Sequence, residues 1–362
     1  MRAGGEMSEK QAQPAVTVAD VLRLAIQKQA SDAIITAGVP PALRVYGDLF
    51  YLKSAPLQAA DTQRLIYDVL SDEQIARFER EKELDFSLSL GAEHRFRVNC
   101  YWQRGAAAAA FRLIPRQIPD LKQLGVPPIM QDLVLRHQGL VLITGPTGHG
   151  KSTTQAALID IVNTEKRVHI VTIEDPIEFL HASRNCVIDQ REVGQDTRSF
   201  AEALRHVLRQ DPDVILIGEM RDLETMRTAL TAAETGHLVI ATLHTNDAVQ
   251  SVDRIIDSFP PHQQSQVRSQ LSLCLLAILS QRLVPRKGGG QLVLATELLC
   301  NNAAVANLIR EGKAQQIYGV METQARAGMY TMDSSLKDLY LKGVVEREEA
   351  RRRMRSPHLL DI

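Results

Sequence analysis

The chain has 362 residues, which predicts two or three domains at about 150 residues each. Hydrophobic residues make up 44% and charged residues 23%, values typical of soluble globular proteins, so the disordered and fibrous classes are excluded. The chain has 42 Lys and Arg residues and 43 Asp and Glu residues, a formal net charge of -1. This balance excludes binding of nucleic acid through bulk positive charge, and a local basic groove is the alternative that remains.

The N-terminal part begins with a polar stretch and continues with short elements. Residues 1–16 predict a flexible tail, in which Met7 is a second candidate start. We expect a helix after Asp20, which would cap its N-terminus. Turn residues then separate three short expected strands, at residues 33–36, 43–46 and 49–51.

A longer helix and a group of strands complete this part. Apolar spacing over residues 62–78 predicts one helix, and strands are expected over residues 84–113. Residues 106–110 are five alanines, which favour a helix, whereas the flanking sequences RFRVNCYW and FRLI favour a strand. We follow the flanking residues and predict a strand.

A proline-rich stretch divides the chain near residue 120. Prolines 115, 119, 127 and 128 predict a linker at residues 116–128, after an N-terminal domain at residues 17–115. A second, larger domain is expected at residues 129–300 and a helical region at residues 301–362. Within the core, apolar runs alternate with helical segments, which is typical of a parallel sheet covered on both faces. These runs lie at residues 140–143, 168–173, 214–217 and 238–243.

Two predicted helices carry clear signals at their ends. Ser199 and Glu202 have the spacing of a capping box, and Asp222 is placed to cap a helix that Gly236 ends. From about residue 303 the pattern is helical to the end, and Lys and Arg crowd residues 342–355. Such a charge run is usually a solvated face, with a partner-binding surface as the alternative.

The segment GPTGHGKS at residues 145–152 fits the phosphate-binding pattern GxxxxGK[ST], between an apolar strand and a helix expected from near Thr153. Glycines let backbone N–H groups wrap phosphates without Cβ clashes, and the helix N-terminus adds partial positive charge. Lys151 would reach the β and γ phosphates, and the Ser152 hydroxyl would bind Mg²⁺. The expected nucleotide-binding residues are Gly145, Thr147, Gly148, Gly150, Lys151, Ser152 and Thr153.

Hydrolysis also needs a carboxylate near the phosphates. Glu174, with Asp175 and Glu178 after it, follows the apolar run VHIVTI, and Glu219 follows VILIG. The carboxyl ends of parallel strands meet at the ligand crevice, so both positions are expected to face the phosphates. Glu219 is favoured as general base because Gly218 stands where many phosphate-loop proteins carry the Mg²⁺-associated aspartate. Capping of a following helix is the alternative role for both acids.

His237 and His244 bracket the apolar run LVIATL, whose ends are expected near the crevice or a subunit boundary. Their spacing on a strand differs from that of a helical metal pair. A purely structural role is the alternative for each histidine.

The cysteines and the apolar segments restrict the cellular class. The 4 cysteines are far apart and include no CxxC pair, which favours reduced thiols over a zinc site. The chain begins without an apolar signal segment and contains no run approaching about 20 apolar residues. We therefore expect a cytoplasmic protein that meets a membrane only through a partner.

Several long motifs together resemble the secretion-type hexameric ATPases, and within them the type IV pilus retraction branch. They are GPTGHGKSTT, VTIEDPIEF, QREVGQDT, DPDVILIGEMRDLETMRTALTAAETGHLVIATLHTNDA, RFRVN and FRLIP. The resemblance extends from about residue 17 to the end. It implies an α/β fold with an N-terminal PAS-like domain, a RecA-like phosphate-loop domain and a helical C-terminal extension, assembled as a homohexamer that binds ATP and Mg²⁺ between the two domains.

The resemblance also assigns residues to roles by their positions in these motifs. It places Glu174 in an acidic box, where it would also bind Mg²⁺ directly or through a water, and makes Glu219 the Walker B glutamate. Arginines of the N-terminal domain, with Arg95 a weaker candidate, would neutralise charge on the transferred phosphoryl group. The expected catalytic residues are Glu219, Glu174, Arg97, Arg112, His244 and His237.

The implied function is Mg²⁺-dependent ATP hydrolysis that powers pilus retraction and twitching motility. The implied partners are the inner-membrane platform protein of the pilus machine and a paralogous pilus ATPase, with no direct nucleic-acid contact and a peripheral place at the inner membrane. Pilus assembly and type II secretion ATPases usually carry a longer N-terminal region and often four zinc-binding cysteines, which this chain lacks. An accessory retraction ATPase, an assembly, secretion or DNA-transfer ATPase and a non-hydrolysing nucleotide-gated regulator remain the alternatives.

Two positions depart from the family pattern. The segment AVANLIREG resembles a helix motif needed for retraction, but Ala306 stands where the family commonly has arginine, which keeps the accessory motor open. His149 stands where serine is common in the phosphate loop. Its side chain should point away from the phosphates, so we expect little effect on nucleotide binding.

Overall fold

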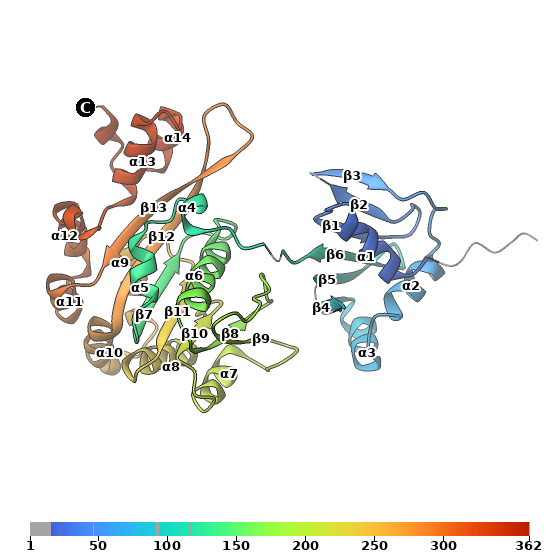
Figure 1. Ribbon diagram of the computed structural model, residues 1–362, viewed down its shortest axis with the longest axis horizontal. Coiled ribbons are helices and arrows are strands. Elements are labelled where there is room, and N and C mark those ends of the chain that lie inside the picture. The colour runs from blue at the N-terminus through green and yellow to red at the C-terminus, as the bar shows by residue number, and fades with distance from the viewer. Residues whose placement is uncertain (1–15, 46, 92–93, 116, 362) are drawn as a thin grey trace, which may run out of the picture. The chain divides into compact units, whose positions relative to one another are not determined.

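The structure, a computed structural model, describes residues 16–45, 47–91, 94–115 and 117–361 (Figure 1). The chain forms two compact units, Met1–Ile114 and Pro115–Ile362. Each unit combines helices with a sheet, which confirms the predicted α/β class. The expected tail falls outside the described residues up to position 15, as do Tyr46 and Arg116.

The first unit contains a 6-stranded antiparallel sheet with the order β3-β2-β1-β6-β5-β4. Its strands are β1 (Asp32–Ile35), β2 (Ala42–Val45), β3 (Asp48–Tyr51), β4 (Glu83–Leu90), β5 (His94–Gln103) and β6 (Ala106–Leu113). Its helices are α1 (Val18–Gln27), α2 (Ala59–Tyr67) and α3 (Asp72–Glu81). The expected strands are therefore present, each within a residue or two of its predicted bounds.

The alanine-rich segment is the strand β6, as predicted. It lies between β1 and β5 and pairs with both. Ala107 and Ala109 are buried against Leu65 and Ile66 of α2, so small side chains allow the helix to pack closely on the sheet. Tertiary packing therefore overrides the helix propensity of alanine at this position.

Two helix predictions in the first unit are wrong in their bounds. The single helix expected over residues 62–78 is two helices, because Ser71 caps α3 in a reciprocal capping box with Gln74. Helix α1 begins before Asp20, since Thr17 is its N-cap and accepts the Asp20 N–H. Asp20 instead closes the box by accepting the Thr17 N–H.

The second unit contains a 7-stranded sheet with the order β13-β12-β7-β11-β10-β8-β9. Its strands are β7 (Gly139–Thr144), β8 (His169–Glu174), β9 (Val187–Glu192), β10 (Val214–Ile217), β11 (Leu238–Leu243), β12 (Leu275–Pro285) and β13 (Leu292–Cys300). All neighbours are parallel except β12 and β13. The predicted parallel sheet is confirmed, while β9 and the β12–β13 hairpin were not predicted.

Helices cover both faces of this sheet (Figure 1). They are α4 (Leu121–Leu124), α5 (Ile129–Val134), α6 (Lys151–Glu165), α7 (Phe200–Val207), α8 (Leu223–Glu234), α9 (Ala248–Asp257), α10 (Pro261–Cys274), α11 (Ala303–Arg310) and α12 (Ile317–Thr323). Two further helices, α13 (Met332–Leu341) and α14 (Arg347–Arg353), lie outside the cores on these two faces. Leu140 and Leu142 of β7 face one core, and Val141 and Ile143 face the other. Alternate residues of one strand are thus buried on opposite faces, which explains why it reads as a continuous apolar run.

The predicted caps of two helices in this unit are present. Ser199 caps α7 by accepting the Glu202 N–H, and Asp222 caps α8 by accepting the Thr225 N–H. Within the stretch expected as a linker, Leu121 and Val126 are buried in the core that α6 covers.

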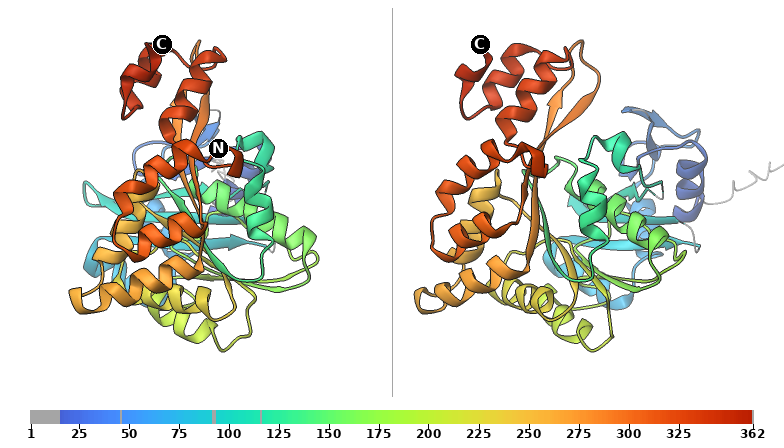
Figure 2. Two further views of the ribbon diagram at one scale, coloured as in Figure 1. Left: turned by 90° about the vertical axis from the view of Figure 1, so that its left-hand side faces the viewer. Right: turned by 60° about the vertical axis from the view of Figure 1, so that its left-hand side comes forward.

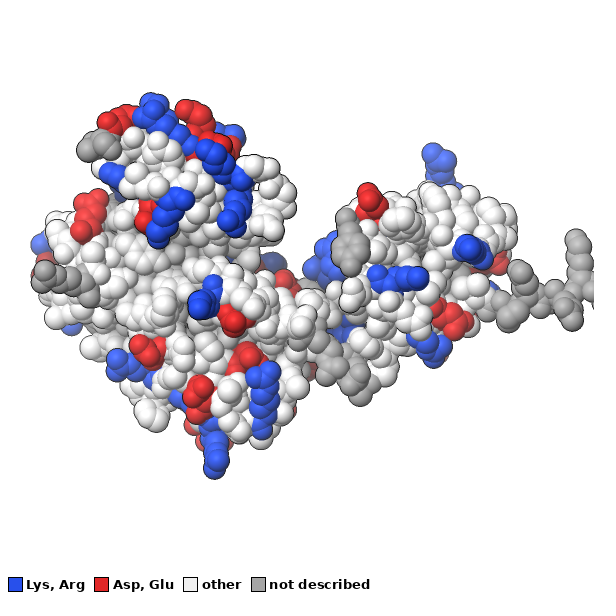
Figure 3. Space-filling model, turned by 45° about the horizontal axis from the view of Figure 1, so that its top comes forward, with Lys and Arg blue, Asp and Glu red and all other residues white. Residues whose placement is uncertain are grey.

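The C-terminal region is helical, as predicted, and its last two helices, α13 and α14, pack on the far ends of β12 and β13 (Figure 2). A separate hydrophobic cluster, here called the C-terminal cluster, joins these strands to α13 and α14. Its buried residues are Val284, Ala295, Met332, Leu336, Val345, Ala350, Met354 and Leu360. Lys and Arg side chains gather over these helices with Asp and Glu among them (Figure 3), so the charge run forms a mixed exposed surface.

Candidate nucleotide site

The phosphate loop connects β7 to α6 at the carboxyl edge of the sheet. Helix α6 begins at Lys151, two residues earlier than expected. Gly145 has φ 138°, and a Cβ there would lie 2.4 Å from the Gln281 carbonyl oxygen of β12. Gly148 and Gly150 both have φ 80° and open space around an added Cβ. The first glycine therefore permits a close backbone approach, and the other two permit the left-handed turns of the loop.

Lys151 lies inside this loop. Its ammonium donates hydrogen bonds to the carbonyl oxygens of Gly145 at 2.8 Å and Pro146 at 2.9 Å. Burial lowers the pKa of this lysine from its ordinary value. The N-cap of α6 is Gly150, so no side chain caps the first N–H groups of this helix. The loop thus combines a fixed cation with backbone donors at a helix N-terminus, which is the chemistry that binds phosphate.

Glu219 follows β10 and is tied to the phosphate loop through His244. The His244 Nε2 lies 2.9 Å from Glu219 Oε2, and its Nδ1 lies 3.3 Å from the Thr147 hydroxyl oxygen. Because an ionised carboxylate only accepts, Nε2–H donates to Glu219 and Nδ1 accepts from Thr147. Arg221 forms an ion pair with the same carboxylate. Burial, Lys151 and Arg221 together lower the pKa of His244, which favours this neutral ring.

Glu174 ends β8 beside the Glu219 segment. Its carboxylate accepts hydrogen bonds from the Thr172 hydroxyl at 2.7 Å, the Gln190 amide at 3.2 Å and the Glu178 N–H at 3.3 Å. Burial outweighs these donors and raises the pKa of Glu174 to about 7. The side chain therefore changes charge close to neutral pH.

Gly218 explains how these two acidic segments approach each other. A Cβ at this position would lie 3.3 Å from Glu174 Cα and 3.3 Å from the Ile173 carbonyl oxygen. A larger residue would therefore push β10 away from β8. Helix capping, the alternative role for both acids, does not apply, because Asp222 caps the helix after Glu219 and Glu174 precedes a loop and β9.

His237 lies at the other edge of the sheet. Its carbonyl oxygen accepts the Gly139 N–H, and its ring Nδ1 lies 3.0 Å from the Ala232 carbonyl oxygen. The 6 residues of β11 separate it from His244, which is about 20 Å of strand. Of these two histidines, His244 contacts the phosphate loop and His237 contacts Ala232.

The arginines expected to act on the phosphates lie in the first unit. Arg97 of β5 is directly opposite Arg112 of β6, which is opposite Asp32 of β1. The Arg112 Nε lies 2.8 Å from Asp32 Oδ1, and Arg44 of β2 is 3.9 Å from the same carboxylate. These side chains form a row with net positive charge across one face of the sheet.

The sequence did not single out three contributors to the site. Thr172 and Gln190 hold the Glu174 carboxylate, and Arg221 pairs with Glu219. Arg221 stands next to the recognised acidic motif, so its charge was a usable signal. Gln190 comes from β9, a strand of mixed polarity that had no predicted place beside β8.

The residues that the structure describes contain neither a cluster of metal-ligating side chains nor a membrane-spanning helix. There, His, Cys, Asp and Glu side chains form no group of three that could hold a metal ion. In the same residues, every helix is too short or too polar to span a bilayer.

Comparisons with known proteins agree with this geometry. The family model described as "Type II/IV secretion system protein" matches residues 9–354. The chain belongs to this family. The type IV pilus retraction ATPase PilT of Pseudomonas aeruginosa is 47% identical over 94% of this chain and 98% of its own length. A twitching motility protein of Neisseria gonorrhoeae is 46% identical over 94% of this chain and 91% of its own length.

Solved structures of secretion family proteins support the fold. A crystal structure of the pilus retraction motor PilT with bound ADP matches at a TM-score of 0.88 and 48% identity, covering 96% of this chain and 99% of that one. The ATPase DotB of Legionella pneumophila matches at 0.82 and 27% identity over 94% and 96% of the two chains. The predicted family and two-part architecture are confirmed.

Proposed function

We propose that this protein is an ATPase of the secretion family whose hydrolysis cycle powers retraction of a type IV pilus. One observation carries the hydrolytic part: Glu219 is joined through His244 to Thr147 of the phosphate loop. A carboxylate held in this way can orient and deprotonate a water beside a phosphate bound in the loop.

The other residues have complementary roles in this proposal. The glycine loop and Lys151 bind the β and γ phosphates, with Thr147 and Thr153 beside them. Mg²⁺ held by the Ser152 hydroxyl, with Glu174 binding directly or through a water, would neutralise phosphate charge. Arg97 and Arg112 would neutralise charge on the transferred phosphoryl group, as their guanidinium chemistry allows. A catalytic role of His237 would require the nucleotide of a neighbouring subunit, because β11 separates this histidine from the phosphate loop of its own subunit.

The pilus assignment rests on relatives that align over nearly their whole length. PilT is named as a pilus retraction ATPase, and its identity to this chain is 47%. We infer a homohexamer on the cytoplasmic side of the inner membrane that acts on the platform protein of the pilus. The hydrolytic motif is complete, which disfavours a non-hydrolysing regulator.

The proposal is tested with Glu219→Gln, which removes the base and keeps the shape of the side chain. ATP should bind with a Kd within about threefold of the wild type, and kcat should fall about 1000-fold. Glu224→Gln, an exposed acid in α8 whose partner is Arg205, is the matched control. Turnover that survives in Glu219→Gln would move the base role to Glu174.

A cellular experiment tests the pilus part separately. Deletion of the gene should leave cells with excess surface pili and no twitching, and the Glu219→Gln gene should restore neither phenotype. Cells without pili would instead identify an assembly motor.

An accessory retraction motor is the second candidate. The type IV pilus ATPase PilU of Pseudomonas aeruginosa is 42% identical over 91% of this chain and 86% of its own length, and Ala306 replaces the arginine common in retraction motors. Normal piliation with weakened movement in the deletion strain would favour this candidate, and Ala306→Arg would then be expected to strengthen movement.

A further inference from the structure

His149, the unusual residue of the phosphate loop, makes a defined contact with the strand β12. Its Nδ1 accepts a hydrogen bond from the Leu283 N–H of β12 at 2.9 Å. The ring must be neutral to accept, and burial together with the charges of Lys151, Arg282 and Arg353 lowers its pKa. The His149 side chain is therefore held by the backbone of β12, a strand outside the phosphate loop.

The contact falls where β12 leaves the parallel sheet. Pairing between β7 and β12 ends at Thr144 and Ser280, so Leu283 lies beyond the reach of β7. The next residue, Val284, is fully buried in the C-terminal cluster with Leu336 and Ala350. The imidazole therefore accepts the Leu283 N–H of β12 at a position where β7 no longer pairs with this strand.

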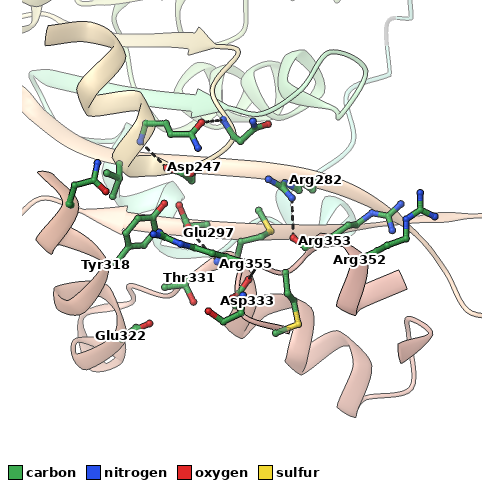
Figure 4. A pocket seen from close by; sticks show the side chains of 17 residues that line it. Asp247, Arg282, Glu297, Tyr318, Glu322, Thr331, Asp333, Arg352, Arg353 and Arg355 are labelled. Carbon is green, nitrogen blue, oxygen red and sulfur yellow. Dashed lines mark hydrogen bonds between the residues drawn. The ribbon is translucent and has the colours of Figure 1, made fainter. Parts of the chain in front are cut away.

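The same stretch of β12 also contacts the C-terminal helix α14. The Arg282 guanidinium donates to the Arg353 carbonyl oxygen at the end of α14, at 3.1 Å (Figure 4). Both arginines also line a polar pocket of about 880 Å³ between α9 and the C-terminal segment. Leu283 thus contacts the phosphate loop, and the adjacent residue Arg282 contacts α14.

We propose that His149 is a positioning residue that ties the phosphate loop to the C-terminal cluster through β12. The tie holds the loop in its phosphate-binding conformation before nucleotide arrives, which raises the fraction of binding-competent molecules. It also makes the loop sensitive to the position of α14, because a shift of α14 moves Arg282 and with it the Leu283 amide. The consequence for nucleotide affinity rests on the proposed ATP binding, whereas the tie itself does not.

The tie is tested first in the nucleotide-free full-length protein by hydrogen exchange of the Leu283 amide. His149→Ser removes the acceptor, and His149→Asn keeps an acceptor at the position of Nδ1. We expect exchange about fivefold faster in the serine variant and within twofold of the wild type in the asparagine variant, since a neutral hydrogen bond contributes about this factor. Equal exchange in wild type and serine variant, or equally fast exchange in both variants, would overturn the proposal.

Nucleotide affinity provides the second measurement. The apparent Kd for ATP should rise about fivefold in His149→Ser and stay within twofold in His149→Asn. An unchanged Kd in His149→Ser would overturn the claim that the tie preorganises the loop. A wild-type protein that does not bind ATP, yet shows the predicted exchange difference, would reject the proposed function and leave the tie standing.

The link to α14 is tested with Arg282→Ala, and the exposed Arg286 of the same hairpin provides the control variant Arg286→Ala. Arg282→Ala should raise the Kd for ATP in the wild-type background and cause no further rise in His149→Ser, because both act through Leu283. Additive effects of the two substitutions would show that α14 does not act through His149.

Discussion

The two edges of the parallel sheet carry the same kinds of side chains and use them differently. At the amino edge, the His237 ring contacts the Ala232 carbonyl, and the His169 ring contacts the Gln210 carbonyl and Asp189. At the carboxyl edge, His244, Glu219 and Lys151 come from different segments and converge on a glycine loop. Residue type alone therefore does not identify a site. The site is identified by which end of the strand, amino or carboxyl, the residue lies at.

The largest effect is expected for a substitution of Gly145, the first glycine of the phosphate loop at the carboxyl edge. Gly145→Ala should lower the free energy of unfolding by about 4 kcal/mol, because backbone strain adds to a clash with the Gln281 carbonyl. Gly236→Ala at the amino edge also has a positive φ, 112°, but open space around the Cβ, so about 2 kcal/mol is expected. Urea unfolding compares the two variants, and equal losses would mean that the close approach to β12 costs nothing.

A second comparison uses the buried acid. The pKa of Glu174 rises from 4.5 to about 7, so the folded state binds its proton more tightly than the unfolded state. Wild-type stability should therefore fall relative to Glu174→Gln as the pH rises from 4.5 to 7, by about 3 kcal/mol in full. Below pH 4.5 the difference should level off, because both states are protonated there.

The measurement for Glu174 is urea unfolding at several pH values. Glu165→Gln, at the exposed C-terminal end of α6, is the control for loss of one carboxylate. A difference between wild type and Glu174→Gln that does not vary with pH would contradict the assigned burial of the charge.

The smallest of these effects is a difference in kcat between variants of His244 and His237. His244→Ala should lower kcat about 100-fold, which corresponds to about 2.7 kcal/mol, because it releases Glu219 from the phosphate loop. His237→Ala should lower kcat less than about threefold in the same steady-state assay. Equal losses would indicate that the amino edge contributes to catalysis through a neighbouring subunit.

Much of the site was predictable because its signals are local. The glycine loop, Lys151 and the two acids are read from short motifs that follow apolar runs, and strand polarity places their ends together. The parallel strands were equally clear, since burial on both faces makes them continuously apolar. Even the alanines of β6 were assigned through their neighbours.

One missed signal is local: the capping box of Ser71 and Gln74 begins a new helix within an apolar pattern that otherwise reads as one helix. The other misses depend on contacts between segments far apart in the chain. The strand β9 alternates between exposed and half-buried positions and gains its place only by pairing with β8. The partner of His149 is 134 residues away, so no local pattern could have revealed it.

The strand β12 belongs to every hydrophobic core of the second unit. Leu275 and Ile278 pack into one face of the sheet, Ala277 and Leu279 into the other, and Val284 into the C-terminal cluster. The helices α13 and α14 are therefore an integral part of the second unit, because they bury one end of β12, a strand that borders the phosphate loop. Loss of α13 and α14 would expose Val284 of β12 and Ala295 of β13 to solvent.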